Sequence, residues 1–178
     1  GGLSWIEFDG VDDWLETPTV DMTTTDEITV IAAARKENTA GTTSPIILNA
    51  SVGSADRSFA LYAPHSKSDR TYAWNVSGNN GDQNFRAIDE GLTAPNVAVQ
   101  TLLSKISSAN GGERVVSRLN GVEKTTFSTS ASGDSGPNFR NDTFRFGNQI
   151  QTGGLFKGRI YQVIVRGKLT EGSNLEGA

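Results

Sequence analysis

The sequence predicts an all-β protein, a jelly-roll sandwich of two antiparallel sheets packed face to face. About twelve short segments rich in β-branched and aromatic residues alternate with turn segments, and no stretch shows a convincing helical period. An Asn120-Gly121 pair stands between two alternating runs, which is the strongest short-range mark of a β-hairpin. Glycine reaches 20 residues, and abundant Thr, Ser and Asn suit many short strands joined by polar turns.

The length and composition narrow the class of protein. A chain of 178 residues suits a single domain over 1–178 with a real core. It begins with Gly1-Gly2 rather than Met and has no visible signal peptide, so we expect a fragment of a longer protein. The absence of cysteine excludes disulfides, Cys-based zinc sites and thiol chemistry, and fits a bacterial or viral origin.

The charge and hydropathy exclude two classes of partner. The net charge is −4 and no basic run occurs, so nucleic acid is not an expected partner. No apolar stretch approaches the roughly 20 residues that span a bilayer, so membrane insertion is not expected either.

The opening segment predicts a pair of strands around a turn. Ile6 and Phe8 share one face while Glu7 and Asp9 share the other, as expected of a half-buried strand. Gly10 permits a sharp reversal, and a second strand then begins at residues 14–15.

A long strand is predicted over residues 27–36. Its small and β-branched residues suit the crowded interior of a sandwich. A helix through the three alanines at 32–34 is the competing interpretation, but the Ile28-Thr-Val-Ile31 run and the missing caps argue against it.

The middle and end of the chain predict further strands. They cover residues 46–48, 59–62, 72–76, 85–88, 95–105, 114–126, 143–148 and 156–166. The second half of 95–105 could instead coil, residues 114–126 form the Asn-Gly hairpin, and 128–138 is a Ser/Gly-rich loop. A terminal helix is expected to start near 169–172 with Thr170 as its cap.

Three of these features together resemble laminin-G-like domains of the concanavalin-A-like lectin/glucanase superfamily. The string at 8–15 is similar to the Phe-Asp-Gly-x-x-Asp-aromatic-aliphatic opening of that family. The Asn-Gly hairpin and the closing strand, with Gly158, Ile160, Val163 and Val165, follow in the family's order. Tyr161-Gln162 replaces the Asp-Glu pair common in the family, which is a departure. The resemblance implies a laminin-G-like sandwich over nearly the whole chain.

Catalysis is not expected. Glu7 and Asp9 superficially match the paired carboxylates of glucanases that share this fold, which need two carboxyl groups about 5–5.5 Å apart. Gly10, however, breaks the strand after Asp9. His65 is the only histidine, and no nucleophile elbow, phosphate loop or His/Cys metal cluster accompanies it.

Calcium is the one cofactor that the sequence suggests. Many relatives of this fold hold calcium at the sandwich edge, and the resemblance implies the same of the dense carboxylates Asp9, Asp12 and Asp13. Ordinary turn aspartates are the alternative.

A glycan site is predicted from aromatic faces that could stack on sugar rings beside polar side chains. The most suggestive set is Tyr62, Tyr72, Trp74, Asn75, Asn80 and Arg86. The alternative for Trp74 is that it belongs to the core.

The resemblance to domains appended to phage virion proteins suggests the function. We expect a non-enzymatic binding or decoration module of a bacteriophage or phage-like virion, on the particle surface or otherwise extracellular. Its partners would be other virion proteins and host cell-surface polysaccharide. A carbohydrate-binding module of a secreted bacterial enzyme is the alternative.

Overall fold

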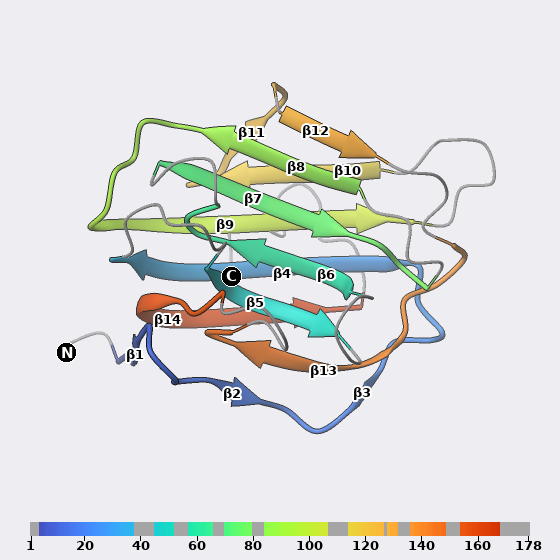
Figure 1. Cartoon of the computed structure of the whole chain (residues 1–178). Helices are drawn as coiled ribbons and strands as arrows, with labels where there is room; N and C mark the ends of the chain where they lie inside the picture. The colour runs from blue at the N-terminus through green and yellow to red at the C-terminus, as the bar shows by residue number, and fades with distance from the viewer. Residues whose placement is uncertain are drawn as a thin grey trace.

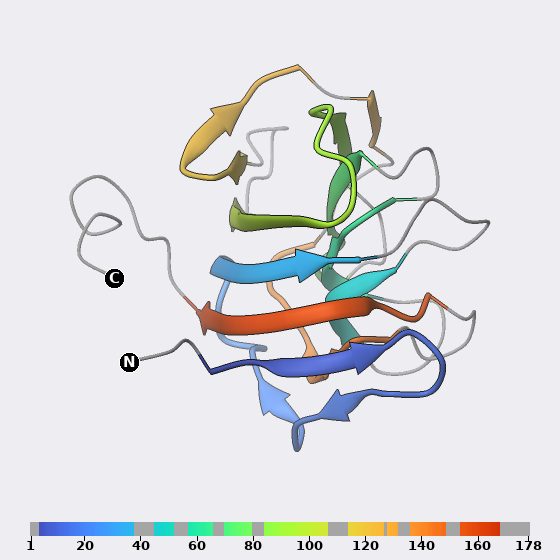
Figure 2. The same ribbon diagram turned by 90° about the vertical axis from the view of Figure 1, so that its left-hand side faces the viewer.

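The computed structural model describes residues 4–37, 45–51, 57–65, 70–79, 84–106, 114–126, 128–131, 136–148 and 154–167. Their strands form two antiparallel sheets that pack face to face, as Figures 1 and 2 show. None of the residues in these ranges forms a helix, so the described part of the chain contains no helix that could cross a membrane. The predicted all-β, two-sheet jelly-roll fold is confirmed.

The first sheet has six strands in the order β1-β14-β4-β9-β10-β11. Its strands are β1 (Ile6–Asp9), β14 (Lys157–Arg166), β4 (Glu27–Lys36), β9 (Asn96–Lys105), β10 (Arg114–Leu119) and β11 (Val122–Lys124). β4 pairs with β9 along its whole length, from Glu27 opposite Lys105 to Lys36 opposite Asn96. The first and last strands of the described residues, β1 and β14, therefore lie side by side at one edge (Figure 2).

The second sheet has eight strands in the order β12-β8-β7-β6-β5-β13-β2, with β3 also paired to β13. Its strands are β12 (Ser128–Ala131), β8 (Asn84–Asp89), β7 (Thr71–Val76), β6 (Arg57–Tyr62), β5 (Ile46–Ser51), β13 (Asn141–Phe146), β2 (Leu15–Glu16) and β3 (Val20–Asp21). Because β13 contacts both β5 and β2, the N-terminal segment closes one edge of this sheet as well.

The core lies between the two sheets and is apolar. Its fully buried members from both sheets include Ile28, Val30, Phe59, Leu61, Trp74 and Leu102. Burial of such side chains contributes roughly 1.5–3 kcal/mol each. The core therefore has enough large side chains to hold the sandwich without disulfides.

The central strands of the eight-stranded sheet are buried on both faces. Every residue of β5 and every residue of β7 is buried, although successive side chains of a strand point to opposite faces. Ala60 and Ala73 belong to a second small cluster on the face turned away from the core. We call this face the outer face of the eight-stranded sheet.

Most predicted elements are confirmed. The segment 27–36 is a strand throughout, not a helix, and 96–105 is a strand to its end. The hairpin turn has positive φ at both Asn120 (52°) and Gly121 (78°), as its turn type requires.

The strands β3 and β12 were not predicted from the sequence, and the predicted terminal helix has no counterpart among the described residues with which to compare it. β3 lies between the predicted opening strand pair and the predicted strand at 27–36, and β12 lies in the expected loop 128–138; both are short, and both pair with strands distant in sequence. The expected terminal helix near Thr170 lies outside the described residues.

Phe8 anchors the open edge of the sandwich. It is the one buried residue of β1, and its ring packs edge-on against Phe156 with centroids 6.2 Å apart. Gly147 has φ +82°, and a Cβ atom there would overlap the Phe8 ring. The absence of a side chain at Gly147 therefore allows β1 to dock.

We expect Gly147→Ala to destabilise the domain more than Gly121→Ala. Both glycines have positive φ, which costs a residue with a Cβ about 1–2 kcal/mol. Only at Gly147 would the new Cβ also strike Phe8, since nothing lies within 4 Å of a Cβ at Gly121. The overlap should add about 1–3 kcal/mol. Urea unfolding of both variants measures the difference, and equal losses would contradict the anchoring role of Phe8.

Candidate functional site

The aromatic strand predicted to face a sugar is in the interior. Tyr62, Tyr72, Trp74 and Asn75 are all nearly or fully buried, with Trp74 at 0% exposure. Trp74 and Tyr72 point into the core between the sheets, while Tyr62 and Asn75 lie on the outer face of the eight-stranded sheet. A ring without an exposed face cannot stack on a sugar, so the core alternative is right for Trp74, and the interpretation of Tyr72 and Trp74 as a sugar platform is wrong.

Tyr72 has structural contacts instead. The Lys36 ammonium nitrogen lies 4.2 Å from the centre of its ring, and its hydroxyl donates to Asn96 Oδ1 at 3.1 Å. Burial raises the pKa of the Tyr72 phenol above its usual value near 10, because the ionised form would be held away from water.

Arg86 links the two sheets. Its guanidinium nitrogen donates to the Val115 carbonyl oxygen at 2.6 Å, across the sandwich from β8 to β10. Burial lowers the pKa of Arg86, and the nearby Glu123 carboxylate partly offsets this effect. Arg86 therefore makes a contact that ties β8 to β10 and serves the fold. Asn80, the remaining member of the predicted glycan set, lies outside the described residues.

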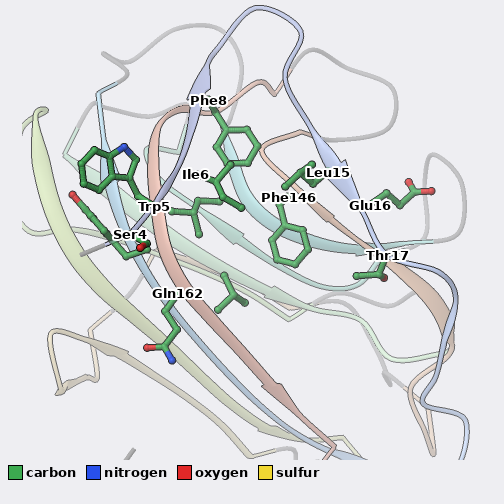
Figure 3. A pocket seen from close by; sticks show the side chains of 12 residues that line it. Ser4, Trp5, Ile6, Phe8, Leu15, Glu16, Thr17, Phe146 and Gln162 are labelled. Atoms are coloured by element: carbon green, nitrogen blue, oxygen red, sulfur yellow. The ribbon is translucent and has the colours of Figure 1, made fainter. Parts of the chain in front are cut away.

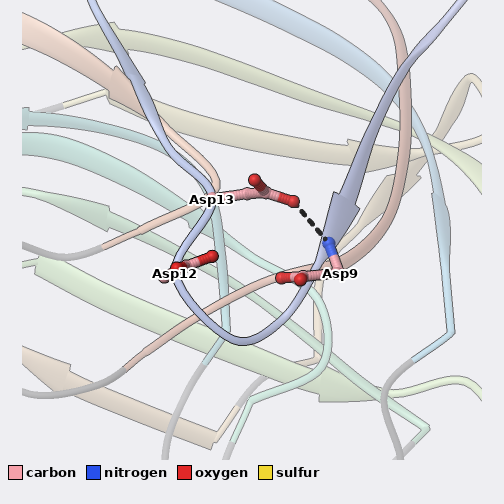
Figure 4. A group of neighbouring side chains, drawn as sticks. All are labelled: Asp9, Asp12 and Asp13. Atoms are coloured by element: carbon pink, nitrogen blue, oxygen red, sulfur yellow. Dashed lines mark hydrogen bonds between the residues drawn. The ribbon is translucent and has the colours of Figure 1, made fainter.

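The three predicted calcium ligands do meet in space. Figure 4 shows Asp9, Asp12 and Asp13 around the turn after β1, and one carboxylate oxygen from each lies within 4.8 Å of the others. Asp13 Oδ2 accepts from the Asp9 backbone N–H at 3.0 Å, and Asp9 Oδ1 accepts from the Val11 N–H at 2.7 Å. All three side chains are exposed. The geometry is compatible with a cation, although Ca²⁺ takes 6–8 oxygen ligands and three carboxylates supply only part of such a shell.

An apolar pocket opens at the same edge, between β1 and β2. Its volume is about 570 Å³ (Figure 3). The aliphatic and phenylalanine side chains that line it are Ile6, Phe8, Leu15, Phe146, Ile160 and Val163, and the rings of Trp5 and Tyr161 line it as well. Ile6 and Leu15 are 52% and 46% exposed, so apolar surface reaches solvent at the mouth. The pocket thus lies where the edge strand β1 of the six-stranded sheet faces the edge strand β2 of the eight-stranded sheet.

Two tryptophans flank this edge and keep about half of their surface in solvent. Trp5 is 48% and Trp14 is 47% exposed. Trp5 lines the pocket together with Ile6 and Phe8 (Figure 3). Sequence reasoning did not single out either residue, although both stand in the opening strand pair among acidic neighbours.

Each exposed indole carries an arginine on one face. The Arg145 guanidinium carbon lies 4.2 Å from the centre of the Trp14 ring, and Arg159 lies 4.8 Å from Trp5. Both arginines are in turn ion-paired: Arg145 Nε donates to Glu16 Oε2 at 2.7 Å, and Arg159 Nε lies 3.3 Å from Glu7 Oε2. Cation–π contacts of this kind contribute about 0.5–1 kcal/mol at exposed sites. They help to fix the orientation of each ring, although about half of its surface stays in solvent.

Comparison with known proteins identifies the fold. No protein-family model matches the sequence, and no curated protein matches it either. A SAP-like pentraxin from Limulus polyphemus has a similar structure, with a TM-score of 0.66 and 14% identity over 93% of this chain and 76% of that chain. The CBM40 of the Ruminococcus gnavus IT-sialidase, solved with α2,3-sialyllactose, gives a TM-score of 0.60 and 14% identity over 97% of this chain and 93% of that chain.

A third likeness is to part of a larger protein. The binding domain of botulinum neurotoxin serotype D gives a TM-score of 0.65 at 12% identity, over 95% of this chain but 40% of that one. This chain therefore spans about two fifths of the length of the toxin structure. At such low identities the likenesses show the fold alone, a concanavalin-A-like jelly roll.

The raised pKa of Tyr72 predicts a pH dependence of stability. In the unfolded chain the phenol ionises near pH 10, whereas in the folded protein it stays protonated. The contribution of the Tyr72 phenol to the free energy of unfolding is therefore complete below pH 10. It is lost as the pH rises from there toward the pKa of the folded protein. The stability advantage of the wild type over Tyr72→Phe should shrink by about 1.4 kcal/mol between pH 9 and pH 11. Urea unfolding at both values measures it, and an unchanged difference would contradict the burial of this phenol.

Proposed function

We propose that this domain is a non-enzymatic binding module that recognises glycans through its N-terminal edge. The observation that carries the proposal is the pair of half-exposed indoles, Trp5 and Trp14, each supported on one face by an arginine. Sugar rings present C–H faces that stack on aromatic rings, and their hydroxyls pair with nearby polar groups.

Trp14 is already held in place, which favours this edge as a binding site because little entropy is lost when a ligand binds. A binding surface loses affinity for each side chain that it must immobilise. Arg145 and Glu16 already hold Trp14 through a guanidinium contact and an ion pair. The indole of Trp14 therefore meets a ligand in a preorganised position, with carboxylate and guanidinium groups beside it for hydrogen bonds.

We place the module on the surface of a bacteriophage or phage-like virion, as an attachment or decoration domain. Its partners there would be other virion proteins and host cell-surface polysaccharide. This placement rests on the resemblance of the cysteine-free, Thr/Ser/Gly-rich chain, with its laminin-G-like opening and closing strings, to domains appended to virion proteins.

A carbohydrate-binding module of a secreted bacterial enzyme is the second candidate. The observation in its favour is the likeness to the CBM40 of the Ruminococcus gnavus IT-sialidase, which covers 97% of this chain and 93% of that one. Both candidates place a glycan on the domain, and the gene neighbourhood separates them. Head or tail genes beside this one favour the virion, and a catalytic domain in the same chain favours the enzyme.

Calcium remains a proposal for the turn after β1. Asp9, Asp12 and Asp13 gather three carboxylate oxygens in one place, and a cation would relieve their mutual repulsion. The turn follows β1, which begins directly after Trp5, and it precedes Trp14, so a bound ion would also stiffen the edge that presents both rings.

Trp14→Ala should abolish or strongly weaken glycan binding without unfolding the domain. Loss of a central aromatic contact costs about 2 kcal/mol or more, which corresponds to roughly 30-fold in affinity. The half-exposed ring should contribute less than about 1 kcal/mol to folding. An array of bacterial surface polysaccharides measures binding, and thermal unfolding measures stability. Val122→Ala, which is exposed on β11 at the opposite edge of the six-stranded sheet, is the control. Undiminished binding by Trp14→Ala would refute the site.

Calcium should stabilise the wild type and not Asp12→Asn. The two hydrogen bonds that hold the turn use Asp9 and Asp13, so Asp12→Asn leaves them in place. A ligand at 100 times its dissociation constant stabilises the folded state by about 2.7 kcal/mol. Thermal unfolding in calcium, in magnesium and in EDTA tests this effect. Identical midpoints in calcium and EDTA would rule out a calcium site.

A further inference from the structure

Exposed apolar side chains gather at the N-terminal edge of the sandwich. Of the seven large hydrophobic side chains that are exposed in the described part of the chain, five lie within residues 5–15. They are Trp5, Ile6, Val11, Trp14 and Leu15, and the other two lie on β9 and on β11. Single exposed hydrophobic residues are ordinary, whereas a group of them in one place on a domain marks an interaction surface.

The backbone of β1 is free to pair on its outer side. β1 is the last strand of the six-stranded sheet, and β14 is its one neighbour among the described strands. The Asp9 backbone N–H donates to Asp13 Oδ2 instead of to β14 (Figure 4). Backbone groups of alternate residues point to the same side of an antiparallel strand, so the N–H and C=O of Glu7 also point away from β14. An edge of this kind is a template on which an extended segment can add as a further strand.

A strand added to β1 would lie between two different surfaces. Ile6 and Phe8 line the pocket of about 570 Å³, which is open to solvent at Ile6. Successive side chains of a strand point to opposite faces, so Glu7 and Asp9 project on the other side of β1. Residues that lie opposite each other in antiparallel strands share a face. Alternate side chains of an added strand would therefore enter the pocket, and those between them would lie beside Glu7 and Asp9.

The charge of this edge is negative. Residues 7–16 contain five carboxylates and no lysine or arginine. Arginines pair with the first and last of these, Glu7 and Glu16, whereas no ion pair in the described part of the chain involves Asp9, Asp12 or Asp13. A second copy of this chain would bring one acidic edge against another, and like charges that face each other destabilise strand pairing. Charge complementarity therefore favours a basic partner over a second copy.

We infer that β1, the aspartate turn at 9–13 and the pocket dock an extended segment of a partner protein in which apolar and basic residues alternate. The segment adds to β1 as an antiparallel strand, as β14 does on the other side. Its apolar side chains fill the pocket, and its basic side chains lie beside Glu7 and the aspartate turn. Main-chain hydrogen bonds to β1 supply affinity, and the pocket and the carboxylates select the side chains. This inference goes beyond glycan binding and does not use Trp14, which does not line the pocket.

Terminally blocked octapeptides are the probes, and fluorescence anisotropy in EDTA, which keeps calcium from the aspartate turn, measures their binding. One peptide alternates valine and lysine, and a second alternates valine and glutamate. Two further valine–lysine peptides carry methyl groups on the backbone nitrogens, one on those of the lysines and the other on those of the valines. The residue opposite Glu7 shares its face and is therefore a lysine, so only methylation of the lysine nitrogens removes the hydrogen bond to Glu7.

Two pairs of variants test the side chains. Asp12→Lys reverses the charge of the turn but leaves the hydrogen bonds of Asp9 and Asp13 in place, and Glu123→Lys makes the same change on β11 at the opposite edge of the sheet. Ile6→Asp places a carboxylate at the mouth of the pocket, and Val122→Asp places one at an exposed apolar position on β11. Thermal unfolding checks that each variant is folded at the assay temperature.

The expected result is saturable binding of the valine–lysine peptide to the wild type, at least tenfold tighter than that of the valine–glutamate peptide. Methylation of the lysine nitrogens should weaken binding about tenfold or more, and methylation of the valine nitrogens should not. Asp12→Lys should weaken binding about threefold or more and Ile6→Asp about tenfold or more, while the two control variants bind as the wild type does.

Three outcomes would overturn the inference. They are no binding of the valine–lysine peptide to the wild type, equal binding of the valine–glutamate peptide, and equal losses in the variants and their controls. A wild type that sediments as a dimer while Ile6→Asp sediments as a monomer would identify a second copy as the occupant and would also overturn it. Glycan binding is measured separately with Trp14→Ala, so failure of the peptide site leaves the proposed function standing.

Discussion

Burial of both faces of β5 and β7 is the constraint on which the rest of this structure depends. A strand in an ordinary sandwich has one dry face and one wet face, so its polar residues reach water. Here every residue of both strands is buried. The core face takes Trp74, and the outer face takes polar residues such as Asn75, which must find partners or remain unpaired. The core face of the sheet is therefore well packed. On the outer face, amide groups such as that of Asn75 have a hydrogen-bonding atom without a partner among the described residues.

The edge formed by β1 and β2 is exposed, in contrast to β5 and β7. β1 and β2 are short, and only Phe8 of β1 is buried, locked over Gly147 and against Phe156. The remaining side chains of the edge are left half in solvent. Exposed apolar surface of this kind marks interaction sites more often than it stabilises a monomer. The pinning of Trp14 by Arg145 orders the ring without covering it completely.

Much of the fold could be predicted from the sequence, because alternation and turn chemistry are local. The strand at 27–36 and the Asn120-Gly121 turn lie where the pattern indicated. The site could not be predicted in the same way. Trp74 and Trp14 both stand in strand-like segments, and whether a ring faces the core or the solvent depends on which strands pair with its own. The meeting of Asp9, Asp12 and Asp13 was predictable, because five successive residues around one glycine cannot lie far apart.

The three tryptophans allow one direct measurement of where a glycan binds. Each indole N–H gives a separate signal in a ¹⁵N–¹H correlation spectrum, and a Trp→Phe variant of each assigns it. During titration with a bacterial surface oligosaccharide, the account predicts a saturable shift of the Trp14 signal with little change at Trp74, because Trp14 is at the open edge and Trp74 in the core. A shift at Trp74 with Trp14 unmoved would contradict it.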